Sequence, residues 1–260
     1  MQPTSTDLKN MKRVMAHTMG TVSPHWERMA ESRHYTDVQR AGWRTVLEGI
    51  VGSEPLDVLD IGSGPGLFAQ IWAEMGHRVT GIDYAPEMVE RAQGRHDRLG
   101  LPSRFVLGEG EAPDLPDASF DVVTNRAVIH MLLEPGRALR EWSRLLRPGG
   151  KLVTVNFAPG PFRPLKAIKS LVQYVQRGSK KMGIKLTKEE MRVMMQTRKA
   201  LPFARTVPAQ IHELFVAAGY EGVGFVSDAP IHEAQQDHED PRVRGSGTQR
   251  YILIGAKPSA

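Results

Sequence analysis

The sequence contains no cysteine, and this excludes disulfides, thiolate metal sites and cysteine nucleophiles. It also lacks any apolar run near the roughly 18 residues that a membrane-spanning helix needs. The first twenty residues hold no continuous apolar stretch of the kind that a secretory signal requires. We therefore expect a cytoplasmic protein with no membrane span.

Internal repeats and low-complexity tracts are missing as well. Hydrophobic residues make up 40% and charged residues 24% of the 260 positions, which is ordinary for a globular protein. This length is common for one α/β sheet with additions. The composition therefore excludes fibrous and disordered classes.

Positive charge is concentrated in one segment. Residues 163–205 hold twelve Lys or Arg and two Glu, a local net of +10, so the rest of the chain carries 5 − 10 = −5. A basic segment of this kind suits an acidic substrate, a nucleic acid or an anionic membrane surface, and equally a solvated helix surface. We predict a basic helical insert over about residues 158–206.

Short apolar runs alternate with helical stripes along most of the chain. The runs predict seven strands, at residues 56–61, 78–82, 104–107, 120–124, 151–156, 223–226 and 251–254. Helical spacing separates them, for example at Leu139, Trp142, Leu145 and Leu146. This order predicts an α/β fold: a Rossmann-like, doubly wound, mostly parallel seven-stranded sheet whose last strand is antiparallel.

A glycine-rich turn follows the first predicted strand, in the run Val-Leu-Asp-Ile-Gly-Ser-Gly-Pro-Gly at 58–66. Its alternating glycines allow a tight turn and a close approach to a ligand, and the helix that begins there offers free N–H groups. Asp83 ends the next strand, where a carboxylate can accept hydrogen bonds from both ribose hydroxyls. The alternative for Asp83 is an N-cap of the helix entered at Pro86.

Five stretches, at 58–66, 81–88, 108–115, 119–124 and 145–155, resemble those of class I S-adenosylmethionine (SAM)-dependent methyltransferases, in particular the small-molecule type 11 group. The resemblance implies SAM as the cofactor and a small molecule as the acceptor, methylated on oxygen or nitrogen, or on carbon. It also implies an N-terminal helical lid over residues 1–50 and a SAM-binding domain over residues 51–260.

The resemblance also implies a set of residues that contact the cofactor. Asp83 holds the ribose, Tyr84 lies beside the adenine, and the acidic side chain of Glu109 contacts the adenine amino group. Carboxylates near the sulfonium suit its positive charge. The full set is Asp60, Gly62, Ser63, Gly64, Gly66, Asp83, Tyr84, Met88, Glu109, Gly110, Glu111, Asn125 and Arg126.

Methyl transfer is an in-line displacement at an activated carbon, so alignment and exclusion of water can supply much of the rate. A phenol, hydroxyl or protonated amine as acceptor benefits from a general base, for which histidine suits neutral pH. His130, a few residues past the fourth strand, is the candidate base. The alternative is a packing residue in the turn 129–133. We expect no metal.

Three other functions are weighed against this one. A nicotinamide-dependent dehydrogenase requires a third glycine one residue later than Gly66. An RNA methyltransferase would use the basic insert, but residues 125–128 read Asn-Arg-Ala-Val, unlike the Asn/Asp-Pro-Pro-Tyr/Phe stretch of enzymes that methylate base amino groups. A SAM-binding protein without transferase activity would carry the same cofactor motifs.

Overall fold

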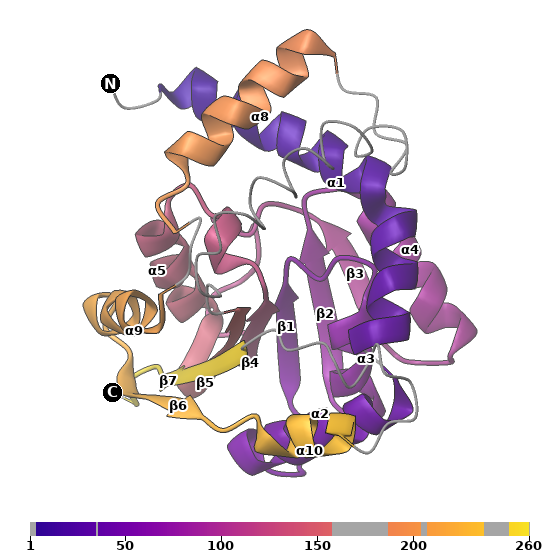
Figure 1. Cartoon of the computed structure of the whole chain (residues 1–260). Coiled ribbons are helices and arrows are strands. Elements are labelled where there is room, and N and C mark those ends of the chain that lie inside the picture. Colours follow the sequence, from indigo (N-terminus) through magenta and orange to yellow (C-terminus); the bar gives the residue numbers. More distant parts are fainter. Residues whose placement is uncertain (1–3, 35, 158–186, 204–206, 237–249, 260) are drawn as a thin grey trace.

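The computed structural model describes residues 4–34, 36–157, 187–203, 207–236 and 250–259. Within them one sheet has the strand order β3-β2-β1-β4-β5-β7-β6 (Figure 1). Its strands are β1 (Asp57–Ile61), β2 (Arg78–Asp83), β3 (Arg104–Leu107), β4 (Phe120–Arg126), β5 (Leu146–Phe157), β6 (Glu221–Val226) and β7 (Arg250–Ala256). In this described part, β7 runs opposite to the other six strands. The predicted fold class is confirmed.

Helices cover both faces of the sheet, and two more lie at one end of it (Figure 1). The described helices are α1 (Ser5–His34), α2 (Asp37–Val51), α3 (Leu67–Glu74), α4 (Pro86–Arg98), α5 (Pro135–Leu145), α8 (Lys188–Ala200), α9 (Pro208–Ala217), α10 (Ala229–Gln236) and the 3₁₀ turn η1 (Ile129–Met131). Helices α1 and α8 cross at the top of Figure 1. None of these helices is both long enough and apolar enough to cross a bilayer.

The sheet separates two apolar cores because neighbouring residues of a strand point to opposite faces. In β1, Val58 packs with the residues of α2 and α3, whereas Leu59 packs with those of α5 and α9. Trp72 and Trp142, both fully buried, anchor the helices of the two sides. Period-two apolar strands thus fix which helices lie on which face.

Helix α2 does not act as part of a lid. Trp43 and Leu47 are fully buried in the core beside α3, and α2 packs against α10, a helix that the sequence analysis did not predict. A capping box between Thr36 and Gln39 fixes its first turn. The segment 1–50 therefore divides into α1, which reaches the site described below, and α2, which belongs to the core.

Two boundaries differ from the predictions in ways that matter for the site. Leu146 is the first residue of β5 instead of the last of a helix, since it pairs with Phe120 before a register shift takes up the turn at 148–150. Strand β4 continues to Arg126, so Asn125 and Arg126 lie within the strand and do not follow it.

Helix α8 begins at a capping box, in which the side chains of Thr187 and Glu190 each accept a hydrogen bond from the other residue's backbone N–H. It packs against α1 through a small buried cluster of Met11, Val14 and Val193. Met195 of α8 is 53% exposed. Residues 158–186 and 204–206, most of the predicted basic insert, lie outside the described residues.

Candidate active site

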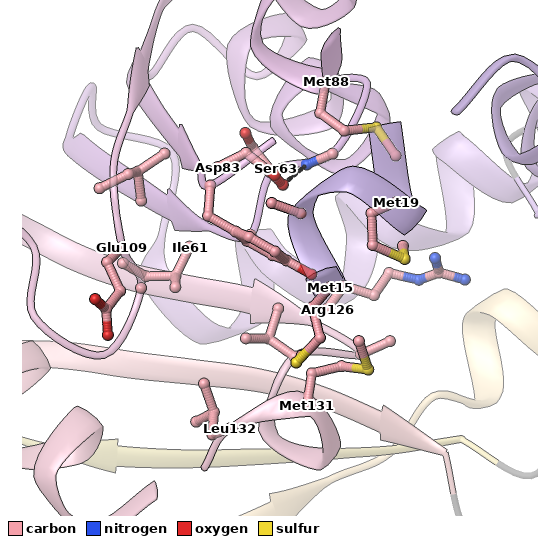
Figure 2. A pocket seen from close by; sticks show the side chains of 18 of the residues that line it. Met15, Met19, Ile61, Ser63, Asp83, Met88, Glu109, Arg126, Met131 and Leu132 are labelled. Carbon is pink, nitrogen blue, oxygen red and sulfur yellow. Dashed lines mark hydrogen bonds between the residues drawn. The ribbon is translucent and has the colours of Figure 1, made fainter. Parts of the chain in front are cut away.

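A cavity of about 660 Å³ lies where β1, β2 and β4 end. The strand order reverses between β1 and β4, and the carboxyl ends of strands at such a reversal are the usual ligand site of doubly wound sheets. Helix α1 lies across this cavity and lines it with Met15, Ala16 and Met19 (Figure 2). The fold therefore brings the glycine-rich turn, the end of β2 and the N-terminal helix to one place.

Most of the predicted site residues line the cavity. These are Asp60, Gly62, Ser63, Gly64, Asp83, Tyr84, Met88, Glu109, Gly110, Glu111, Arg126 and the candidate base His130. Gly66 and Asn125 are not among the described residues that line it. Asn125 is fully buried within β4, between Ile61 of β1 and Thr154 of β5.

Gly66 serves the packing of the turn against α4. A Cβ on Gly66 would lie 3.1 Å from Cβ of Ala92, and its φ of 78° also favours glycine. His96 of α4 holds the same turn, since its Nε2 lies 2.9 Å from the Gly66 carbonyl oxygen. These two contacts explain a glycine at this position by packing, and contact of Gly66 with the cofactor stays a prediction.

The glycine-rich turn is tied to the end of β2. The N–H of Gly64 donates to Oδ2 of Asp83 at 2.9 Å, and the N–H groups of Gly62 and Ser63 both donate to the Ile82 carbonyl. No atom lies within 4 Å of a Cβ built on Gly64, whose φ is 53°. The backbone here is therefore bare and faces the open cavity.

The Asp83 carboxylate holds two loops at once. Besides Gly64, it accepts a 2.9 Å bond from the N–H of Ala85, which is the N-cap residue of α4. Asp83 thus supports the start of α4 without being its N-cap. Burial raises the pKa of Asp83, while the N–H groups of Ala85 and Gly64 work to lower it.

Asp60 is a buried carboxylate that lacks a full set of partners. The residue is 1% exposed, and its Oδ2 has no hydrogen-bond partner among the described residues. Burial, and then the charge of Asp83, raise its pKa well above the ordinary value. Ser63 and Tyr84 likewise present buried hydroxyls without a partner in the described part of the chain. Buried polar atoms normally have hydrogen-bond partners, so these atoms suit a polar ligand.

These features fit SAM. Its ammonium group suits the unpartnered oxygen of Asp60, its ribose suits Asp83, and its compact sulfonium centre suits the bare backbone at Gly64. The unpartnered hydroxyl of Tyr84 lies in the same cavity. The donor set therefore matches a nucleoside that carries an amino acid.

Lys12 of α1 pairs with two carboxylates at the cavity edge, those of Glu109 and Glu111. Burial works to lower the pKa of Lys12, but the two carboxylates outweigh it and hold the pKa above its ordinary value. Glu111 also accepts hydrogen bonds from the N–H groups of Leu133 and Glu134. Glu111 therefore connects α1 to the residues just after η1.

His130 lies on η1 and lines the cavity. Burial lowers its pKa, so the imidazole is neutral near pH 7 and can accept a proton. His17, which lies on α1, is 3.7 Å from Glu190 instead and joins α1 to α8. The side chains of His25 and His34 lie outside the described residues.

An apolar end of the cavity was missed by the sequence analysis. Figure 2 shows sulfur atoms gathered on one side, with Glu109 on the opposite side. The methionines that line the cavity are Met15, Met19, Met88 and Met131. Met11, Met15 and Met19 recur every four residues, so helical periodicity could have found this face. Among the described residues, no group of three His, Asp or Glu side chains is placed to hold a metal ion.

Comparison with known proteins agrees with this geometry. Residues 59–154 match the family model described as a methyltransferase domain. The chain is 35% identical over 120 residues to a malonyl-[acyl-carrier protein] O-methyltransferase of Serratia marcescens, covering 46% of each protein. It is 33% identical over 140 residues to a ubiquinone biosynthesis O-methyltransferase of Pseudomonas aeruginosa, covering 52% of this chain and 59% of that one. The chain thus spans about half the length of these curated relatives.

A solved structure shares the fold over nearly the whole chain. It is a SAM-dependent methyltransferase of Thermotoga maritima, described as a possible histamine N-methyltransferase. The TM-score is 0.59 at 19% identity, with 93% of this chain and 99% of that chain covered. Helix α1 lies outside the segment that the family model matches.

Proposed function

We propose, on the premise that residues 59–154 form a class I SAM-dependent methyltransferase domain, that this protein transfers the methyl group of SAM to a small-molecule acceptor. The observation that carries the proposal is the unpartnered Oδ2 of buried Asp60, in the same cavity as the bare backbone at Gly64. A buried, unsatisfied carboxylate is costly unless a ligand completes it.

Each end of the cofactor has residues to hold it. Asp60 accepts from the ammonium group, and Asp83 accepts from the ribose hydroxyls while it keeps Gly64 in place. Tyr84 and Glu109 lie on the adenine side. Lys12 already shares the Glu109 carboxylate, so the adenine amine and the lid helix would use the same side chain.

SAM supplies an already activated methyl group, so the protein's task is alignment and exclusion of water. Helix α1 covers the cavity and turns Met15 and Met19 toward it. His130, neutral because burial lowers its pKa, accepts a proton from an acceptor hydroxyl or amine as the new bond forms. The curated relatives named above act on oxygen, which favours a hydroxyl.

The RNA-directed alternative gains no support from the described residues, because most of the basic insert that motivated it lies outside them. A SAM-binding protein without transferase activity is separated from our proposal by its products. Only a transferase generates S-adenosylhomocysteine when an acceptor is supplied.

The decisive experiment has two parts. Calorimetry of the purified protein with SAM and with S-adenosylhomocysteine tests the cofactor, and Asp60→Asn should weaken both. Incubation with SAM and a panel of phenols and amines, followed by mass spectrometry, tests the transfer. Absence of binding heat with either nucleoside overturns the proposal. Binding without S-adenosylhomocysteine formation across the panel would assign the protein to the non-transferase class.

A further inference from the structure

The far end of the cavity is an apolar wall built by three separate segments. Helix α1 contributes Met15, Ala16 and Met19, while η1 and the end of β5 contribute Met131 and Phe157. We call these five residues the methionine wall. Except for Met131, they lie outside the segment that matches the methyltransferase domain.

The cationic side chains that line the cavity are all engaged with other groups. Lys12 pairs with Glu109 and Glu111. The guanidinium of Arg126 lies 5.2 Å from the ring centre of Phe157, a cation–π arrangement. Arg13 donates to the Asn10 side chain at 3.0 Å. The basic groups that share the cavity with the methionine wall thus already have partners.

Helix α1 is fixed at several points, so its methionines have a defined place. Glu27 forms ion pairs with Arg91 at 3.0 Å and Arg95 at 2.8 Å on α4. Lys12 fixes the other half of the helix to the loop after β3. Between these anchors Met15 and Met19 turn to the cavity, as spacing by four on one helix face requires.

We propose that the methionine wall binds the body of the acceptor, and that this body is an uncharged, flexible apolar chain or ring. Methionine is unbranched and polarizable, so several methionines form a wall that adapts to irregular apolar shapes. A charged group placed there would be desolvated without a free partner. Met15 and Met19 are then specificity-determining residues. The inference rests on the proposed function for the position of the reacting group.

A homologous series of ligands tests this directly. The methyl, ethyl, propyl and butyl esters of 4-hydroxybenzoic acid share one phenol and differ only in apolar chain length. Their affinities are measured by calorimetry near neutral pH, with and without S-adenosylhomocysteine. Each buried methylene should tighten binding about three- to fourfold. Affinity that does not change with chain length in both conditions overturns the proposal.

Substitutions on α1 test whether Met15 and Met19 cause the dependence of ester affinity on chain length. Met15→Gln and Met19→Gln keep side-chain length and helix propensity but should flatten the dependence on chain length. Met195→Gln on α8, where the residue is 53% exposed, is the matched control. It should leave the slope, the change in ester affinity with each added methylene, as in the wild type. A slope that persists in the double variant Met15→Gln/Met19→Gln also overturns the proposal.

The two measurements distinguish a failure of this inference from a failure of the proposed function. Loss of nucleoside binding in the wild-type protein would refute the cofactor assignment while the ester series still reports on the wall. Nucleoside binding together with a flat ester series would refute the wall alone. Thermal unfolding of each variant shows whether α1 has kept its place.

Discussion

The ammonium of Lys12 lies 2.6 Å from Oε2 of Glu111, and the other oxygen of Glu111 accepts the N–H groups of Leu133 and Glu134. One buried carboxylate therefore joins α1 to the segment that follows His130. The side chain of Glu111 is only 5% exposed. Loss of its cationic partner would leave a charge in a poorly solvated place.

Lys12→Met should therefore loosen α1. We expect a loss of about 1–2 kcal/mol in the free energy of unfolding, below the cost of breaking a fully buried pair because Lys12 is partly exposed. Hydrogen exchange should speed up across residues 5–34. Arg192→Met, which breaks a solvent-exposed pair with Glu189 on α8, is the control and should change neither measurement. Unchanged hydrogen exchange in Lys12→Met would show that the ion pair of Lys12 with Glu111 does not hold α1 in place.

The Asp60 carboxyl should make the ligand-free protein less stable as the pH rises. Its pKa in the folded protein is raised, chiefly by burial, so the folded state prefers the protonated form. The stability contributed by that form is complete below the unfolded pKa and is lost as the pH rises through the folded pKa. Asp60→Asn removes this loss of stability at high pH, because the amide does not ionise.

We thus expect ligand-free Asp60→Asn to be more stable than the wild type near pH 8, by about 1–3 kcal/mol, while it binds SAM more weakly. The gain should shrink toward pH 4. Asp57→Asn, on the same strand, is a control for which we expect the opposite pH dependence of stability. Arg78 and Arg147 lower the pKa of Asp57, so its stabilisation is present at neutral pH and is lost on acidification. Urea unfolding at several pH values measures both variants, and equal stability of Asp60→Asn and wild type at pH 8 would contradict the assignment.

Asp83 should control cofactor affinity. Asp83→Asn leaves a single acceptor oxygen for the two N–H groups of Gly64 and Ala85, with less remaining for a ribose. We expect SAM binding to weaken by about 1–3 kcal/mol, roughly 5- to 150-fold. Asp97→Asn on α4, where the carboxylate accepts from Gln93 at an exposed position, should bind SAM like the wild type. Calorimetry with equal affinities for Asp83→Asn and wild type would remove Asp83 from the site.

The sheet and the glycine-rich turn could be predicted because their signals are local. Apolar alternation marks a strand, and a glycine run after it marks the turn. Helix α1 is different, since it continues through Gly20 and Pro24, residues that usually interrupt a helix. Tertiary contacts stabilise it there, among them the ion pairs of Glu27 with α4. A Cβ on Gly20 would overlap the carboxylate of Glu87, so α1 approaches α4 closely at this residue.

Partners distant in sequence could not be predicted. Nothing near Lys12 in the sequence indicates that it meets Glu111, ninety-nine residues later. The same holds for Gly66, where a ligand and a packed helix both require glycine, so the pattern alone does not distinguish them. The residues predicted from local motifs, such as Gly64 and Asp83, do line one cavity. The part of the cavity that α1 lines depends on how α1 packs, and only the structure shows that packing.

His130 provides the sharpest test of the chemistry. If it is the base, His130→Gln should lower kcat by about 10²–10⁴-fold and leave SAM affinity within about twofold. Because burial lowers its pKa, the acid limb of the wild-type kcat profile should fall below the ordinary histidine value of 6.5, where the imidazole becomes protonated. That limb should disappear in His130→Gln. His17→Gln, which alters a histidine paired with Glu190, should keep both the rate and the limb. Full turnover in His130→Gln would mean that alignment alone drives the transfer and that His130 only packs the turn after β4.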